Sequence, residues 1–103
     1  MPKKQMDTLT EPMYYTLIAL WEPRCGIEIT EFVMRLTKNR VRLVPGTLYT
    51  MLSKFEHEGM IVEVSAEGRK RTYMITEKGR SMVKEEYERL KTMLQDGALW
   101  LEG

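Results

Sequence analysis

Apolar side chains recur at helical spacing in three stretches of the first 58 residues. The first stretch follows Thr10, whose hydroxyl suits a helix N-cap, and Glu11 and Pro12 are both favourable in a first turn. Pro23 and Gly26 end it. Its periodic positions are Met13, Leu17, Leu20 and Trp21. The pattern predicts a helix that begins at residue 11 and packs one face on a core.

The other two stretches predict helices over residues 27 to 37 and 45 to 58. Pro45 suits the first turn of the third helix, and Gly59 suits its end. The residues expected on the core side are Ile29, Phe32, Val33 and Leu36 in the second helix and Leu48, Met51, Leu52 and Phe55 in the third. The outward side of the third helix is then formed by Thr47, Tyr49, Thr50, Ser53 and Lys54.

After Gly59 the period changes from that of a helix to that of a strand. Residues 60 to 65 alternate in a β-like pattern, a turn follows at Glu67-Gly68, and residues 71 to 75 supply a return strand. We therefore expect a two-stranded hairpin.

Thr76 can cap a last, long helix with a heptad-like seam. The seam residues are Val83, Tyr87, Leu90 and Leu94, spaced by four, three and four positions. The simplest partner for such a seam is its own copy in a second subunit. The alternative is that the helix folds back on its own core. Gly97 weakens the helix, so Leu99, Trp100 and Leu101 are expected in a tail that clasps the partner.

Three helices followed by a hairpin are the order of a winged helix-turn-helix. The predicted fold class is mainly α (α+β), with a two-stranded wing and a long C-terminal dimerisation helix. Residues 1–75 form the expected DNA-binding domain, and residues 76–103 form the dimerisation helix and tail. In this arrangement the helix at 45 to 58 enters the major groove, and the wing reaches the adjacent backbone.

The charge distribution supports a polyanionic partner, although the net charge is only +1. Residues 35 to 54 and 68 to 72 contain no Asp or Glu, and together they hold half of the 16 Lys and Arg residues. Both segments flank the third helix, and the local field matters more to a polyanion than the total charge does. The competing interpretation is that these are ordinary solvated charges.

Composition limits the other classes of protein. At 43% apolar and 30% charged residues, the chain is neither disordered nor membrane-spanning in type. Lys3 and Lys4 are followed by Gln5, Asp7 and Thr8 rather than by an apolar run, so no secretory signal is expected and the cytoplasm is the default location. The single Cys25 cannot build an internal disulfide framework.

An enzymatic role is not expected. The only histidine, His57, lies between two glutamates near the end of the third helix, where an exposed residue is a better interpretation than a general base. One His and one Cys make no convincing metal site, and no glycine-rich phosphate loop is present. No cofactor and no metal are expected.

Six short pieces of the chain, in order, resemble the PadR-type transcriptional regulators. They are Leu9-Thr10-Glu11-Pro12, Gly26-Ile27-Glu28-Ile29, Pro45-Gly46-Thr47-Leu48-Tyr49, Glu58-Gly59-Met60-Ile61, Gly68-Arg69-Lys70-Arg71-Thr72-Tyr73 and Ile75-Thr76-Glu77-Lys78-Gly79. The resemblance covers roughly residues 8 to 95 and implies a dimeric winged-helix repressor of the short subgroup, with one C-terminal helix. Ile27 replaces the family's usual aromatic residue, a change expected to alter packing more than DNA contact.

The predicted site residues follow from these positions. The DNA-binding residues are Thr47, Tyr49, Thr50, Ser53 and Lys54 on the third helix, Arg40 and Arg42 in the connector, and Arg69, Lys70 and Arg71 in the wing. The dimer-interface residues are Tyr14, Ile18, Val83, Tyr87, Leu90, Leu94 and Trp100. Two alternatives remain, since Tyr49 is also suited to half-buried packing and Arg71 to a contact within the protein.

The expected function is that of a homodimeric repressor that binds a palindromic operator in double-stranded DNA. Trp21, Tyr14, Ile18, Leu99 and Trp100, with several Met residues, suit an apolar pocket between subunits for a small aromatic effector. The plainer interpretation is that Trp21 is core and the C-terminal residues only pack. The alternative function is a winged-helix adaptor that binds proteins rather than DNA.

Overall fold

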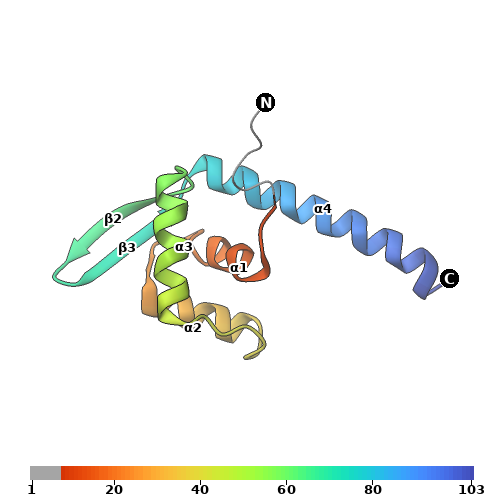
Figure 1. Ribbon diagram of the computed structural model, residues 1–103, viewed down its shortest axis with the longest axis horizontal. Helices are drawn as coiled ribbons and strands as arrows, with labels where there is room; N and C mark the ends of the chain where they lie inside the picture. The colour runs from red at the N-terminus through yellow and green to blue at the C-terminus, as the bar shows by residue number, and fades with distance from the viewer. Residues whose placement is uncertain (1–7) are drawn as a thin grey trace.

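The computed structural model describes residues 8–103, which form four helices and one three-stranded antiparallel sheet (Figure 1). The elements in chain order are α1 (Glu11–Ala19), β1 (Arg24–Cys25), α2 (Gly26–Leu36), α3 (Pro45–His57), β2 (Ile61–Glu67), β3 (Lys70–Ile75) and α4 (Glu77–Leu101). The winged-helix prediction is confirmed. Lys3 and Lys4 lie outside the described residues.

The predicted helix caps are present. The Thr10 hydroxyl accepts a hydrogen bond from the Met13 N–H at 3.4 Å, and the Thr76 hydroxyl accepts one from the Gly79 N–H at 3.2 Å. Gly59 follows α3 with a φ of +76°, a left-handed conformation that most other residues avoid. The sequence therefore sets these helix ends locally.

The core forms where α1, α2 and α3 meet the base of the wing. Among the fully buried side chains are Leu17, Leu20, Ile29, Leu48, Leu52, Phe55, Met60 and Ile61. Leu36 contradicts the prediction, because it is the last residue of α2 and remains 51% exposed. Val41 and Leu43 of the connector are buried instead, after Lys38 and Asn39 turn the chain with left-handed φ angles of 53° and 65°.

The sheet has one strand more than the predicted hairpin. β1 is only two residues long, and it pairs Arg24 with Tyr73 and Cys25 with Thr72 of β3, so the order is β1-β3-β2. The wing itself contains an irregularity between Glu63 and Ser65. The turn end of the β2–β3 hairpin extends away from the other elements (Figure 1).

The helix α4 starts against the core and then leaves it (Figure 1). Val83 is buried, whereas Tyr87, Leu90 and Leu94 are 53%, 40% and 73% exposed. The alternative in which the seam folds back on its own core is therefore wrong for these three residues. None of the described helices is long and apolar enough to cross a bilayer.

The predicted C-terminal tail is also wrong, because α4 continues through Gly97 to Leu101. A single glycine costs a helix interior only about 1 kcal/mol, and the residues on both sides of Gly97 remain helical. Trp100 consequently lies on the last turn of the helix, where it is 89% exposed.

Candidate nucleic-acid interface

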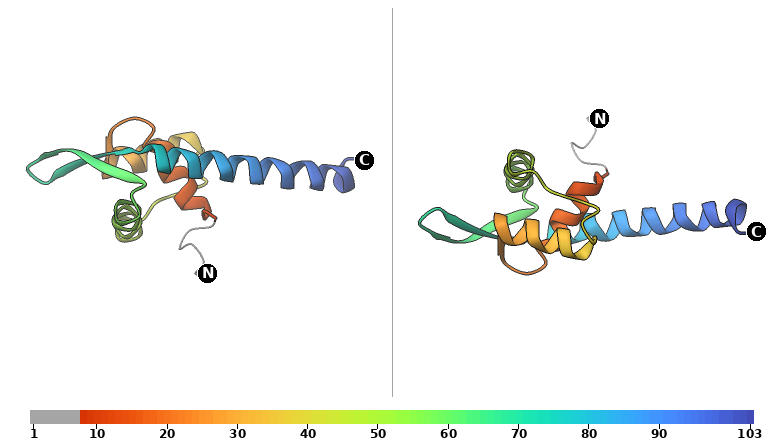
Figure 2. Two further views of the ribbon diagram at one scale, coloured as in Figure 1. Left: turned by 90° about the horizontal axis from the view of Figure 1, so that it is seen from above. Right: turned by 90° about the horizontal axis from the view of Figure 1, so that it is seen from below.

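The helix α3 presents a polar face away from the core. Leu48, Leu52 and Phe55 anchor the helix, each at most 2% exposed. The exposed residues include all five predicted on this helix: Thr47, Tyr49, Thr50, Ser53 and Lys54. Figure 2 shows α3 end-on, to one side of the plane that contains the wing and α4. The helix is thus free to enter a groove.

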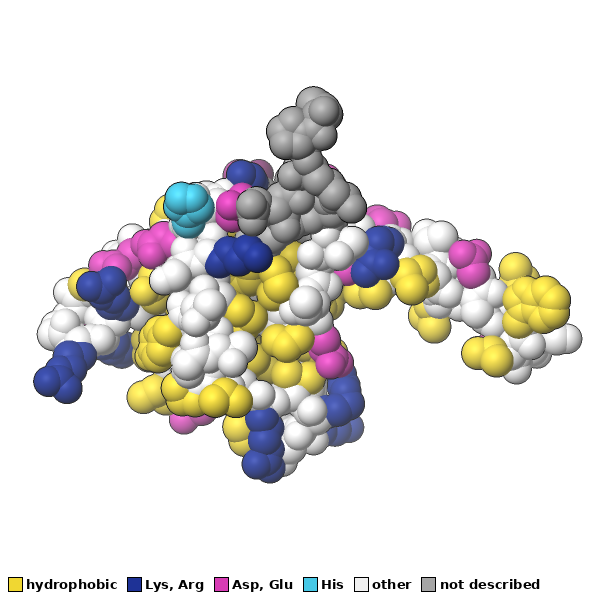
Figure 3. Space-filling model, in the orientation of Figure 1, with side chains coloured by type: hydrophobic (Ala, Val, Ile, Leu, Met, Phe, Trp, Pro, Cys, Tyr) yellow, Lys and Arg dark blue, Asp and Glu magenta, His cyan; other side chains and the backbone are white. Residues whose placement is uncertain are grey.

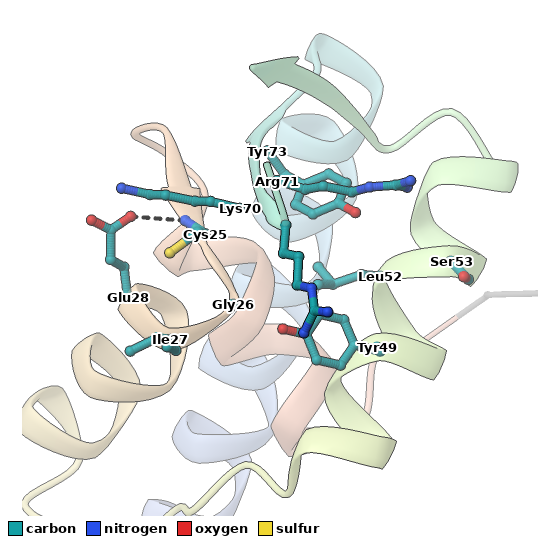
Figure 4. A pocket seen from close by; sticks show the side chains of 11 residues that line it. Cys25, Gly26, Ile27, Glu28, Tyr49, Leu52, Ser53, Lys70, Arg71 and Tyr73 are labelled. Atoms are coloured by element: carbon teal, nitrogen blue, oxygen red, sulfur yellow. Dashed lines mark hydrogen bonds between the residues drawn. The ribbon is translucent and has the colours of Figure 1, made fainter. Parts of the chain in front are cut away.

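A groove of about 770 Å³ runs between α3, the wing and the N-terminus of α2 (Figure 4). Five of the ten predicted DNA-binding residues line it: Tyr49, Ser53, Arg69, Lys70 and Arg71. The other lining residues are Cys25, Gly26, Ile27, Glu28, Leu52 and Tyr73. The structure therefore brings hydroxyls of the third helix and cations of the wing, about twenty positions apart in sequence, to one place.

Ile27 was expected to change packing more than DNA contact. It is 69% exposed and forms part of the groove wall, so the packing expectation is wrong. The replacement of an aromatic residue at this position changes the groove surface rather than the core.

Tyr49 is 53% exposed, and its ring leans toward the start of α2. A Cβ placed on Gly26 would lie only 2.6 Å from the Tyr49 hydroxyl oxygen and 3.1 Å from Cζ. Real Cβ atoms do not approach other atoms so closely, so only glycine leaves room for this ring position. Tyr49 is therefore exposed toward the groove, and the absence of a side chain at Gly26 leaves room for its hydroxyl there.

The three wing cations are all exposed. Arg71 approaches Glu63 of the neighbouring strand at 3.7 Å, a pair that is largely solvated and therefore weak. Lys70 extends toward Glu28 at the beginning of α2 (Figure 4). The Glu28 carboxylate accepts a hydrogen bond from the Cys25 N–H at 2.8 Å, and this bond, helped by the Lys70 charge, lowers the pKa of Glu28.

The connector cations lie apart from the groove. Arg40 donates a hydrogen bond to the Tyr15 hydroxyl at 2.8 Å and approaches Glu11 of α1 at 3.9 Å. Arg42 is exposed and does not line the groove. Figure 3 shows dark-blue Lys and Arg side chains at the wing, near the top of α3 and along the lower edge of the same face. Cations thus surround α3 on this face, although they do not form one continuous patch.

Two predicted dimer residues, Tyr14 and Ile18, are partly buried on α1. Burial, together with neighbouring Tyr15, Tyr87 and Glu86, raises the pKa of Tyr14. Tyr14 is therefore close to α4. Val83 is only 5% exposed within its own chain, so it belongs to the subunit core and offers little surface to a partner.

One charged residue on α4 is almost completely buried. Glu86 is 4% exposed, accepts two hydrogen bonds from the Arg89 guanidinium, and has its pKa lowered mainly by that contact. Both residues belong to α4 and are three positions apart, so the pair joins neighbouring turns of this helix.

The candidate catalytic and metal-binding side chains do not come together. Within residues 8–103, no three His, Cys, Asp or Glu side chains gather in a way that could hold a metal ion. His57 is exposed at the end of α3, and Cys25 is buried. The groove residues that were missed are Leu52 on the core side of α3 and five residues of β1, α2 and β3, and nothing in the local spacing of those five marks them as neighbours of α3.

Comparison with known proteins adds a family-level match. The model of the transcriptional regulator PadR-like family matches residues 16–85. A transcriptional regulator from Clostridium thermocellum shares 20% identity with a TM-score of 0.73, over 88% of this chain and 92% of that one. RosR from H. salinarum shares 22% sequence identity with a TM-score of 0.65, over 95% of this chain and 100% of that one.

A PadR-like transcription factor from Bacteroides fragilis shares 23% identity with a TM-score of 0.66, over 82% of each chain. At sequence identities of 20 to 23%, these similarities show a shared fold and nothing finer. No curated protein matches the sequence.

Proposed function

Because the chain belongs to the PadR-like family of transcriptional regulators, we propose that it is a homodimeric repressor that binds a palindromic operator in double-stranded DNA. Residues 1–75 are the DNA-binding unit in this proposal, and residues 76–103 are the dimerisation unit. Such a regulator acts in the cytoplasm. A small aromatic effector relieves the repression.

The groove beside α3 is the observation that carries the proposal. Phosphates are bound by cations and hydroxyls, whereas base edges are read by a helix in the major groove, which is about 12 Å wide. Tyr49 and Ser53 face the same groove as Arg69, Lys70 and Arg71. We propose that α3 enters the major groove and that the wing binds the adjacent phosphates, while Arg40 and Arg42 contact the backbone from the connector.

The exposed seam of α4 supports a dimer. The seam residues Tyr87, Leu90 and Leu94 are 53%, 40% and 73% exposed, and such apolar surface is stabilised when a second helix covers it. Trp100, beyond the seam, is 89% exposed. A two-fold pair would present two copies of α3 about one turn of DNA apart, which suits a palindrome.

The effector part of the proposal rests on the aromatic residues between α1 and α4. Tyr14 and Ile18 are partly buried, and the Arg80 guanidinium lies 5.3 Å from the centre of the Trp21 ring. Trp100 would join them from the partner. The plainer interpretation, without an effector pocket, is that Trp21 is a partly buried residue packed against the core. Quenching of Trp fluorescence by planar aromatic compounds supports the pocket, and no response across a panel counts against it.

Gel retention of Tyr49→Ala and Arg69→Ala tests the DNA proposal. Both side chains are exposed, so both variants are expected to keep the wild-type circular dichroism spectrum and to lose operator retention. Lys84→Ala on α4 is the matched control, because it removes an exposed cation far from the groove. Wild-type retention by both groove variants would remove the assignment. Weak DNA affinity that hardly depends on salt would favour the protein-binding adaptor.

A further inference from the structure

The first nine residues of α3 lack the side chains that most often read bases. Residues 44 to 53 contain no Arg, Lys, Asn, Gln, Asp or Glu. Guanine is usually read by Arg or Lys and adenine by Asn or Gln, in each case through two hydrogen bonds. Lys54 is the first such residue, and it lies near the other end of the helix. Bidentate readout is therefore absent from the part of α3 that enters a groove first.

Thr50 and Val44 are exposed residues in this part of the chain, and both carry methyl groups. The Thr50 hydroxyl donates a hydrogen bond to the Gly46 carbonyl at 3.0 Å, so the helix backbone uses its polar atom and the methyl group remains for a ligand. Val44, the N-cap residue, is 63% exposed and makes no side-chain capping bond. At Gly46 an added Cβ would meet nothing within 4 Å, so bases can approach the backbone there.

We propose that the exposed methyl groups of Val44 and Thr50 each read a thymine through its C5-methyl group. Thymine is the only base that presents a methyl group in the major groove of unmodified DNA, and apolar side chains recognise it by excluding water from both methyls. The inference rests on the proposed function, since it assumes that α3 enters the major groove. It assigns A·T pairs to the operator positions that face the start of α3.

Replacement of thymine by deoxyuridine tests the assignment, because the exchange removes only the methyl group. A duplex is first selected from random sequences with the full wild-type chain. Each A·T pair of the half-site is then changed to A·U in turn. Wild-type affinity is expected to fall about fourfold at each thymine that contacts Val44 or Thr50, the loss typical of one buried methyl group.

Variants of Thr50 separate its methyl from its hydroxyl. Thr50→Ser keeps the hydroxyl, should lose about fourfold on the thymine duplex, and should show no further loss on the matching uracil duplex. Thr50→Val keeps a methyl group and removes only the hydroxyl that is bonded to the Gly46 carbonyl, so it should bind within about twofold of the wild type. Val44→Ala should behave like Thr50→Ser at a different thymine.

Three outcomes would overturn the inference. They are a selected half-site without A·T pairs opposite α3, equal wild-type affinity for all thymine and uracil duplexes, and weaker binding in Thr50→Val but not in Thr50→Ser. In each of these cases DNA binding itself still stands. If no duplex is selected at all, both this inference and the proposed function fail.

Discussion

The helices α3 and α4 carry similar apolar patterns but lie in opposite surroundings. In α3, Leu48 and Leu52 are 2% exposed and Phe55 is fully buried, whereas Leu90 and Leu94 of α4 are 40% and 73% exposed. The chain therefore fixes α3 with its own core, which leaves the hydroxyl-rich face in a defined position. The distal half of α4 has no such support within the chain. In our account one subunit positions the DNA-reading surface, and only a second subunit sets the distance between two such surfaces.

The largest effect is expected when the α4 seam is disrupted. The double variant Leu90→Glu, Leu94→Glu places two carboxylates in the proposed dimer contact, so the chain should become monomeric. Operator affinity should fall by roughly 100-fold or more, since the two half-sites then bind independently. Analytical ultracentrifugation and gel retention measure the two effects. Lys84→Glu, an exposed change on the same helix, is the control. A double variant that stays dimeric contradicts the role given to α4.

The next largest effect is expected in the wing. Replacing Arg69, Lys70 and Arg71 together by Ala should weaken operator binding by about 10- to 100-fold at moderate salt, while the dimer stays intact. The log–log dependence of affinity on salt should become shallower by roughly one unit for each phosphate that the altered wing no longer binds. Fluorescence anisotropy across a salt series measures both. An unchanged slope would show that the wing does not touch the backbone.

A smaller effect is expected from a single methyl group at Gly26. Gly26→Ala should displace the Tyr49 hydroxyl, which the added Cβ would approach to 2.6 Å, and should weaken operator binding by about tenfold at most, the loss of one hydrogen bond. In a Tyr49→Ala background the same change should have almost no effect, and this non-additivity is the measurement that matters. Equal losses in both backgrounds would mean that Gly26 acts on the fold and not through Tyr49.

The smallest effect is expected from Glu86→Gln, on the way the stability of the fold depends on pH. The Arg89 contact lowers the pKa of Glu86 in the folded chain, so the ionised carboxylate stabilises the fold when the pH is above the ordinary glutamate pKa. That stability is lost as the pH falls through the folded pKa. Glu86→Gln should cost about 1 kcal/mol at pH 7, and its Tm should depend less on pH between about 3 and 5 than the wild-type Tm does. Parallel Tm curves would contradict the role of the pair.

Local signals in the sequence predicted most of the fold. A hydroxyl at Thr10 or Thr76 and a glycine at position 59 act within one turn of the chain, so their effect is visible without knowledge of the tertiary structure. The same holds for the periodic core positions of α3. The predictions for Leu36 and Gly97 were wrong because both concern where a helix ends. One helical turn more or less changes the free energy too little for the local sequence to fix the end.

The site was predicted less completely because it depends on contacts between distant segments. β1 exists only because Arg24 and Cys25 pair with β3, and two residues carry no periodicity of their own. The same pairing brings Gly26 beneath Tyr49. Arg40 looked equivalent to the wing cations in a count of charges, yet it lies outside the groove, beside Tyr15 and Glu11 of α1. Charge is visible in the sequence, but the direction in which a side chain points is not.

The salt dependence of operator binding tests the central claim most directly. The claim is that cations and hydroxyls beside α3 grip the phosphates of a duplex from both subunits. It predicts that the affinity of the wild-type chain for its selected duplex falls steeply between about 50 and 200 mM salt, with a log–log slope of several units. An affinity that stays nearly constant over this range would contradict the claim.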